Sequence, residues 1–132
     1  PLNKQTRAGI ARLLPAFASV KNPVDTVAMS DYELYKNAME TLLADKDLNC
    51  VMVIYVHGGF TDPMEPARAV VDSVRAKYPK PVVACWMGGE DIDAVARMFR
   101  KSRVPFYPVP ERAAEALRTL IEYNEFLTRR HS

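Results

Sequence analysis

The sequence predicts an α/β domain in which a parallel β-sheet lies between layers of α-helices. Two strand-like apolar runs, residues 51–56 and 81–86, are followed by the glycine pairs Gly58-Gly59 and Gly88-Gly89. These pairs lie thirty positions apart, about the length of one strand–helix unit. A helix-like segment follows each run. This alternation is typical of a three-layer fold with right-handed crossovers and helices on both faces of the sheet.

The first third of the chain is expected to contain two helices and one short strand. Apolar side chains favour a helix over residues 4–14, and an extended piece is expected at Phe17–Val20. Ser30 and Glu33 fit a capping box, in which Ser30 accepts from the first helical turn and Glu33 reaches back. Behind this box, apolar residues recur at helical spacing over residues 34–43.

The rest of the chain alternates between strands and helices. Strand 50–56 is followed by a helix with Asp62 as its N-cap and Pro63 at its first position. The elements expected after that helix are a strand at 81–86, a helix over 92–99, a strand at 104–107 and a final helix from Glu111, with apolar residues as far as Leu127.

Four strands are found in this pattern, whereas a complete flavodoxin-like domain has five. The sequence therefore predicts a flavodoxin-like parallel sheet, flanked by helices, that lacks its first strand. We expect that strand to lie before Pro1. Residues 1–132 are interpreted as one domain, and the absence of an initial methionine favours a fragment of a longer, multidomain protein.

Composition argues against several functional classes. The 18 basic and 16 acidic side chains are interspersed, so no basic stripe indicates nucleic-acid binding. No apolar run is long enough to span a membrane, and no residue cluster has metal-ligand spacing. Cys50 and Cys85 lie in apolar runs, which favours small core residues in a reducing, cytoplasmic compartment. Association into a homo-oligomer is left open.

The carboxyl ends of parallel strands are where open α/β sheets bind ligands. His57 lies at such an end beside Gly58 and Gly59, and glycine there lets the backbone approach a ligand or adopt a positive φ. A histidine in this place could be a nucleophile, a base or a phosphate carrier. The sequence offers His57 no partner, which favours a hydrogen-bonding loop residue. The alternative for both glycine pairs is a tight turn that binds nothing.

A second candidate loop follows the expected strand at 17–20. Asn22 precedes proline and is held extended, which can aim its amide into a cleft at the sheet edge. Asp25 either faces a ligand or bonds nearby backbone amides, as aspartate often does in turns. The sequence does not decide between these two roles.

The third candidate loop contains Trp86, Gly88 and Gly89. The helix that follows opens with acidic residues at positions 90, 91 and 93. They suit the electrostatics of a helix N-terminus but compete with phosphate for that place. The loop of Gly58 and Gly59 is therefore the better phosphate candidate.

An ordered set of motifs resembles one protein family. The motifs are Asn22-Pro23-Val24-Asp25, Lys80-Pro81-Val82-Val83, Trp86-Met87-Gly88-Gly89, Val104-Pro105-Phe106-Tyr107 and Pro110-Glu111-Arg112-Ala113. Over roughly residues 6–127, their order is similar to the C-terminal flavodoxin-like domain of NDP-forming acyl-CoA synthetases, relatives of succinyl-CoA synthetase. The run 54–62 also resembles the glycine-glycine loop of the succinyl-CoA synthetase β subunit.

The resemblance implies a reaction and a set of partners. The family converts acyl-CoA, phosphate and ADP into free acid, CoA and ATP through an acyl phosphate and a phosphohistidine. It implies that the parent enzyme uses CoA, ATP or ADP, phosphate and Mg. It also implies that this domain packs against a CoA-binding domain that carries the phosphohistidine, works with an ATP-grasp domain, and helps form the acyl/phosphate pocket.

The departures from the family pattern limit this inference. The Ser-His-Thr-Gly-like segment that carries the phosphohistidine is missing, so His57 does not inherit its role. We therefore expect no catalytic residue and no ligase activity in this chain alone. The alternatives are a stand-alone flavodoxin-like module that binds a small anion or a CoA ester, and a non-catalytic interaction domain.

Overall fold

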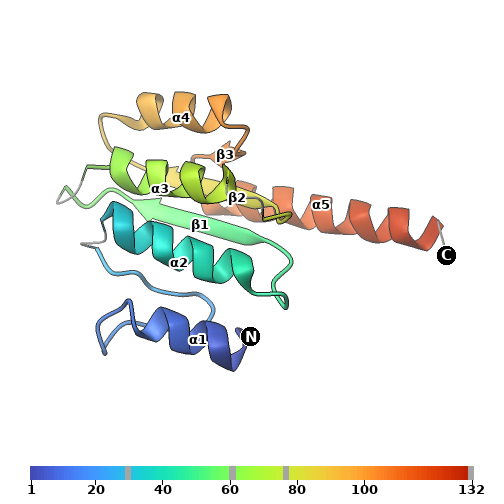
Figure 1. Cartoon of the computed structure of the whole chain (residues 1–132). Helices are drawn as coiled ribbons and strands as arrows, with labels where there is room; N and C mark the ends of the chain where they lie inside the picture. Colours follow the sequence, from blue (N-terminus) through green and yellow to red (C-terminus); the bar gives the residue numbers. More distant parts are fainter. Residues whose placement is uncertain (29–30, 60–61, 76–77, 131–132) are drawn as a thin grey trace.

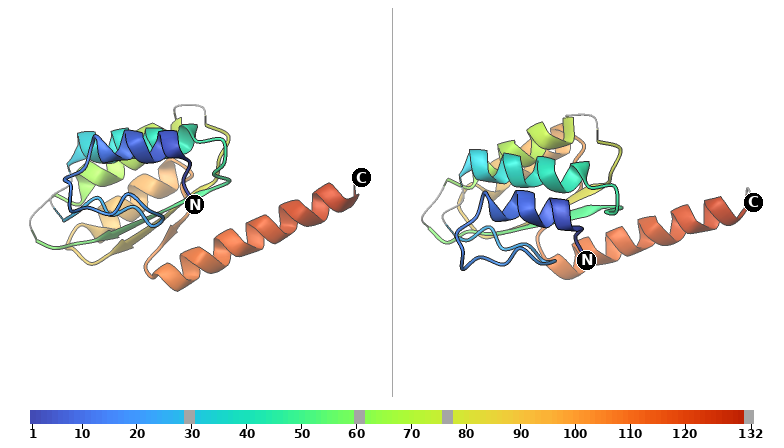
Figure 2. Two further views of the ribbon diagram at one scale, coloured as in Figure 1. Left: turned by 90° about the horizontal axis from the view of Figure 1, so that it is seen from below. Right: turned by 60° about the horizontal axis from the view of Figure 1, so that its bottom comes forward.

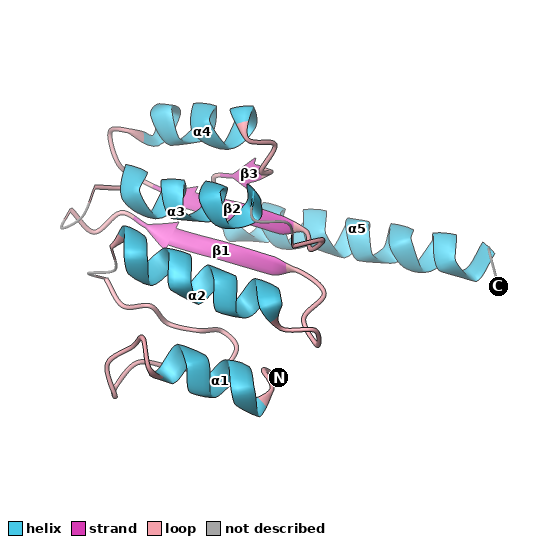
Figure 3. Ribbon diagram, in the orientation of Figure 1, coloured by secondary structure: helices cyan, strands magenta, loops and turns pink. Residues whose placement is uncertain are grey.

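A computed structural model describes residues 1–28, 31–59, 62–75 and 78–130 of the protein. The architecture is a parallel sheet between helices (Figures 1 and 3). In chain order the elements are α1 (Lys4–Ala11), α2 (Tyr32–Ala44), β1 (Val51–Val56), α3 (Met64–Arg75), β2 (Val82–Met87), α4 (Ile92–Lys101), β3 (Phe106–Tyr107) and α5 (Pro110–Arg130). The α/β fold class predicted from the sequence is confirmed.

The sheet has the strand order β1-β2-β3, and both neighbouring pairs are parallel. Val51 pairs with Val82, and Val56 pairs with Met87. The expected strand at Phe17–Val20 is wrong, because the described residues there form turns and bends with no sheet partner. Phe17 is 83% exposed. An extended piece without a neighbouring strand leaves its backbone groups to water, so the described part of the chain forms three strands where four were expected.

The two faces of the sheet are covered unequally. On one face, α2, α3 and α4 pack over the inward side chains of β1 and β2 and enclose the main core around Trp86 and Phe99. On the other face, α5 covers Val83 and Cys85 of β2 with Ala113 and Leu117. α1 lies outside this sandwich and packs against α2 (Figure 1). Helices on both faces confirm the three-layer prediction.

The helix starts follow capping rules, with one shift. Asp31, one residue after the expected Ser30, is the N-cap of α2, and its Oδ1 accepts from the backbone N–H of Leu34 at 2.9 Å. Ser30 lies outside the described residues. Asp62 accepts from the N–H of Met64 at 2.8 Å, so the predicted cap of α3 is confirmed.

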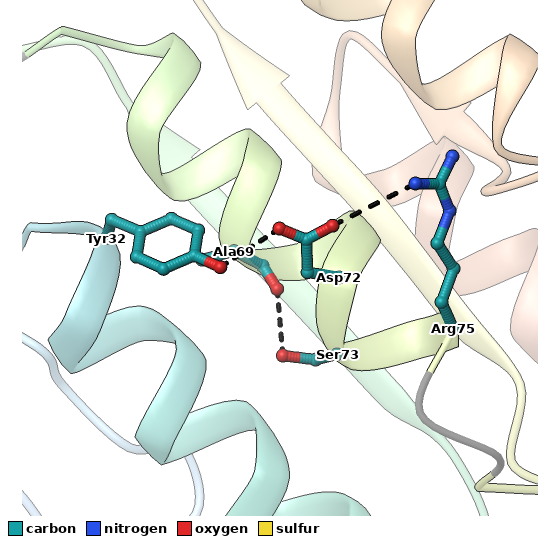
Figure 4. Close-up of polar contacts among 5 residues, drawn as sticks. All are labelled: Tyr32, Ala69, Asp72, Ser73 and Arg75. Atoms are coloured by element: carbon teal, nitrogen blue, oxygen red, sulfur yellow. Dashed lines mark hydrogen bonds and ion pairs between the residues drawn. The ribbon is translucent and has the colours of Figure 1, made fainter.

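A polar contact joins α2 to α3 on their solvent side (Figure 4). The Tyr32 hydroxyl donates to Asp72 Oδ2 at 2.9 Å, and Arg75 lies 4.0 Å from the other carboxylate oxygen. Hydrogen bonding to Asp72 raises the pKa of Tyr32. These groups are exposed, so the contact fixes the start of α2 against α3 but contributes little to stability.

A buried carboxylate ties α1 to the end of α2. Asp45 Oδ1 accepts from the side-chain amide of Asn3 at 2.7 Å and from the N–H of Asp47 at 2.9 Å. Lys80 donates to the backbone carbonyls of Leu43, at 2.7 Å, and of Asp45. Hydrogen bonding from the Thr6 side chain is the largest of several effects that lower the pKa of Asp45.

Replacing Asp45 by alanine should lower the free energy of unfolding by about 2–3 kcal/mol at pH 7, because buried donors lose their acceptor. The pKa of Asp45 in the fold is lower than its ordinary value of 3.8, so its charge stabilises the fold above that value. This contribution is lost as the pH falls through the lowered pKa. Urea unfolding of the wild type and Asp45→Asn should therefore differ at pH 7 and converge at acidic pH, below that lowered pKa. The exposed Asp47→Ala is the matched control, with an expected change of under about 0.5 kcal/mol.

α5 extends well beyond the sheet, and the C-terminus lies far from the other elements (Figure 2). Its apolar side was expected to be buried, but only Ala113 and Leu117 are, because only the first half of the helix lies over strands. Leu120, Ile121, Tyr123 and Phe126 are exposed. Within the described ranges, no helix combines the length and apolar character needed to cross a bilayer.

Candidate functional site

The two glycine loops lie side by side at the carboxyl edge of the sheet. The register of β1 and β2 brings both loops to that edge, and the N–H of His57 donates to the carbonyl of Met87 at 2.9 Å. Strand pairing therefore continues one residue past β1 before the chains turn away. The sequence placed both loops at this edge, and the structure adds that they form one surface.

The second glycine pair supports the ring of His57. A Cβ built on Gly89 would lie 3.3 Å from His57 Cγ, and one on Gly88 would lie 3.7 Å from His57 Cβ. Gly88 and Gly89 have φ values of 78° and 95°, which L side chains rarely adopt. Gly59 also has a positive φ, of 77°, but nothing lies within 4 Å of its Cβ position. Gly88 and Gly89 are thus packed under the histidine, while the space at the Cβ position of Gly59 is unobstructed.

Alanine at the two loops should therefore have unequal effects. Gly59→Ala adds only the strain of a positive φ, about 1 kcal/mol, whereas Gly89→Ala adds a close contact with His57 and should cost about 2–3 kcal/mol. In a His57→Ala background, most of the additional loss of stability caused by Gly89→Ala should disappear. Urea unfolding of the wild type, Gly89→Ala, His57→Ala and the double variant forms a double-mutant cycle, with Gly59→Ala measured beside it. Equal costs for the two glycines, or no coupling to His57, would contradict this packing.

Tyr55 is the neighbour of His57 that sequence reasoning missed. Its hydroxyl oxygen lies 3.5 Å from His57 Nδ1, and its ring stacks on Trp86 with centroids 4.8 Å apart. The sequence did contain a signal for this contact, because Tyr55 and His57 are two positions apart and residues two apart on a strand lie on the same face. The pair gives His57 an orienting contact but supplies no strong base or acid.

Trp86 lies within β2, with its side chain only 1% exposed in the core. Its ring meets Phe99 edge-on at 5.1 Å. Trp86 therefore cannot present its ring to a ligand at the loops. Its packing in the core fixes β2, the strand that Gly88 and Gly89 follow.

The segment with Asn22 and Asp25 makes a turn and borders a groove. Asp25 Oδ1 accepts from the N–H of Val27 at 2.9 Å, which is the turn role that the sequence left open. Asn22 is exposed and lines a groove together with Leu48 and Cys50, near the amino end of β1. Asn22 was expected at a cleft on the sheet edge because it follows the predicted strand at 17–20, and that strand does not form.

This groove borders the first strand of the sheet. It has a volume of about 200 Å³ and lies between β1, α2 and residues 22–26. Its lining includes Tyr35, Met39 and Leu42 of α2. Burial raises the pKa of Tyr35, so its hydroxyl stays protonated at neutral pH.

The charged side chains beside the second glycine loop are acidic. The acidic residues Glu90, Asp91 and Asp93 surround the start of α4, where Asp91 is the N-cap but makes no side-chain capping bond. An anion is disfavoured there. Among the described residues, no group of three or more His, Cys, Asp or Glu side chains could hold a metal ion. The loops can offer backbone groups to a ligand, and their described residues include no paired nucleophile and base.

Comparison with known proteins identifies the family. Residues 3–120 match the Ligase-CoA domain. The chain belongs to this family. It is 32% identical over 117 residues to the α subunit of ADP-forming acetate–CoA ligase I from Pyrococcus furiosus, covering 88% of this chain and 25% of that protein. It is 29% identical over 123 residues to ADP-forming acetate–CoA ligase I from Archaeoglobus fulgidus, covering 93% of this chain and 17% of that protein.

A solved structure has the same fold. It is an acetyl-coenzyme A synthetase from Ca. Korarchaeum cryptofilum in complex with phosphate and ADP, which matches with a TM-score of 0.86 and 29% identity over 93% of this chain and 27% of that one. The Ligase-CoA domain described here thus spans about a quarter or less of the length of these relatives.

Proposed function

We propose that this Ligase-CoA domain forms one wall of the acyl/phosphate pocket of an NDP-forming acyl-CoA synthetase. The enzyme would convert acyl-CoA, ADP and phosphate into free acid, CoA and ATP. The observation that carries the proposal is the joined surface of the two glycine loops at the carboxyl edge of the sheet, in a chain that matches this family. Relatives named as ADP-forming acetate–CoA ligases support it.

The loop of Gly58 and Gly59 is the part that would face the ligand. Both residues are exposed, and the open space at Gly59 allows a phosphate or carboxylate close to the backbone. The N-terminus of α4 is acidic and would border the pocket without binding the anion. Mg would be held elsewhere in the enzyme, because the described residues offer no cluster of ligands for it.

The remaining walls would come from the CoA-binding domain with the phosphohistidine and from the ATP-grasp domain. CoA and ADP would bind mainly to those domains, and we infer that the protein works in the cytoplasm. The exposed apolar residues on the projecting half of α5 suit a surface that companion domains cover: Leu120, Ile121, Tyr123 and Phe126.

Calorimetry with residues 1–132 tests the proposal. CoA, acetyl phosphate and ADP should each bind more weakly than about 1 mM, because one wall cannot enclose a small ligand. Micromolar binding of CoA would contradict the proposal and favour the alternative, a stand-alone binding module. A Gly59→Ala variant that abolished such binding would place the module's site at the same loop.

A further inference from the structure

Tyr55 and His57 form a polar pair where β1 meets its glycine loop. The Tyr55 hydroxyl oxygen lies 3.5 Å from His57 Nδ1. Tyr55 is 6% exposed and its ring is stacked on Trp86, so its hydroxyl is held by the core. His57 is only half-buried. The pair therefore connects a fixed group in the core to a side chain at the surface of the loops.

The second glycine loop fixes the imidazole of His57 from another side. A Cβ on Gly89 would lie 3.3 Å from Cγ and 3.6 Å from Cδ2 of the ring, and the His57 backbone N–H donates to the carbonyl of Met87. A half-turn of the ring would carry Nδ1 away from Tyr55. The contacts therefore favour the orientation in which Nδ1 faces the tyrosine.

The chemistry of this contact decides which nitrogen of His57 carries the proton. A phenol O–H is a stronger acid than an imidazole N–H, and a neutral imidazole nitrogen is a stronger base than a phenol oxygen. The favoured bond is therefore donation from Tyr55 to Nδ1, which places the imidazole proton on Nε2. Among the residues that the structure describes, Nε2 has no hydrogen-bond partner. His57 thus has one N–H to offer to a ligand.

The surroundings suit a neutral donor. Glu90 and Asp91 follow the glycine pair on which the ring packs, and neither forms an ion pair with His57 in the described part of the chain. A charged imidazolium would attract these carboxylates, whereas a neutral N–H can bind an oxyanion without recruiting them. Gly59, two residues further along, is exposed and has an unobstructed Cβ position.

We propose that Tyr55 is a positioning residue that holds the proton of His57 on Nε2, and that this N–H binds an oxyanion of the substrate at the loop of Gly58 and Gly59. The oxyanion belongs to phosphate or to the carboxylate of the acid. The choice of ligand rests on the proposed function, whereas the tautomer rests on the contact with Tyr55. His57 binds and orients the ligand without exchanging a proton with it.

Nitrogen-15 NMR of recombinant 1–132 tests the tautomer at about pH 8, above the ordinary pKa of histidine. His131, outside the described residues, is replaced by glutamine so that His57 gives the only imidazole signals. We expect Nε2 to resonate as a protonated nitrogen and Nδ1 as an unprotonated one. Tyr55→Phe should shift both resonances toward each other, while the amide spectrum shows that the variant is folded. A protonated Nδ1 in the wild type, or unchanged resonances in Tyr55→Phe, would overturn the proposal.

Two substitutions of His57 in the natural protein test the ligand. The side-chain amide nitrogen of glutamine takes the position of Nε2, and that of asparagine takes the position of Nδ1. His57→Gln should therefore keep the KM for the oxyanion within about threefold, whereas His57→Asn should raise it about tenfold or more with a smaller change in kcat. A raised KM for phosphate during ATP formation identifies phosphate, and a raised KM for the acid in the reverse reaction identifies the carboxylate.

The outcomes separate this proposal from the proposed function. Equal KM values for wild type, His57→Gln and His57→Asn in both directions would overturn the role of Nε2 and leave the ligase function standing. A natural protein that forms no ATP would overturn the ligase function together with the choice of ligand. The NMR spectra decide the role of Tyr55 in either case, because they need no substrate.

Discussion

Replacing Trp86 by alanine is expected to lower the free energy of unfolding by about 3–5 kcal/mol, enough to unfold much of a domain of ordinary stability. The ring is buried between Tyr55 and Phe99, at centroid distances of 4.8 Å and 5.1 Å. Removing it leaves a large cavity beneath α3 and α4. Far-UV circular dichroism in urea is the suitable measurement, since Trp86 is the only tryptophan and its fluorescence is lost with it.

Two further variants serve as controls for this prediction. Trp86→Phe should cost only about 1–2 kcal/mol, because the indole N–H has no hydrogen-bond partner among the described residues and phenylalanine keeps most of the packing. Tyr123→Ala removes an aromatic ring that is 59% exposed on α5 and should change stability by under about 0.5 kcal/mol. A Trp86→Phe variant as unstable as Trp86→Ala would show that the ring is held by its N–H and not by packing.

Proline at two adjacent positions of β1 should destabilise the fold to very different extents. The N–H groups of Val51 and His57 donate toward β2, and alternate residues of a parallel strand point to the same neighbour. Val53→Pro removes an N–H that points to β2 and should cost about 3 kcal/mol or more, since the β1–β2 ladder is then broken at its centre. Ile54→Pro removes an N–H that points to the other edge, where the described residues give β1 no strand neighbour, and should cost about 1 kcal/mol.

Urea unfolding of both proline variants measures this difference, with Val53→Ala and Ile54→Ala as controls for the lost side chains. Comparable losses at the two positions would mean that both edges of β1 are paired in solution.

Local signals predicted the later two thirds of the fold well. The strands at 51–56 and 81–86 were found because short apolar runs end in glycine pairs, and Asp62 was found as a cap because its helix begins directly behind Pro63. Each of these features depends on neighbouring residues. The strand at 17–20 failed because a strand needs a partner, and the sequence of the segment does not contain one.

The candidate site was predicted only in part for the same reason. Both glycine loops lie at the expected edge, but the packing of His57 on Gly89 depends on strand register, which no local pattern reveals. Asn22 was misplaced because its position was derived from the failed strand. Trp86 was grouped with the loop since it is close to Gly88 in sequence, yet it faces the core because β2 is buried on both faces.

The most direct test of the central claim is an assay of ATP formation from acyl-CoA, ADP, phosphate and Mg with a panel of acyl-CoA esters. It should be run in parallel on recombinant 1–132 and on the protein purified from its natural source. We expect ATP formation by the natural protein and none above the blank by residues 1–132, because the proposed function gives the loops of this domain one wall of the pocket and no catalytic group. ATP formation by residues 1–132 alone, or none by the natural protein with any ester, would contradict this function.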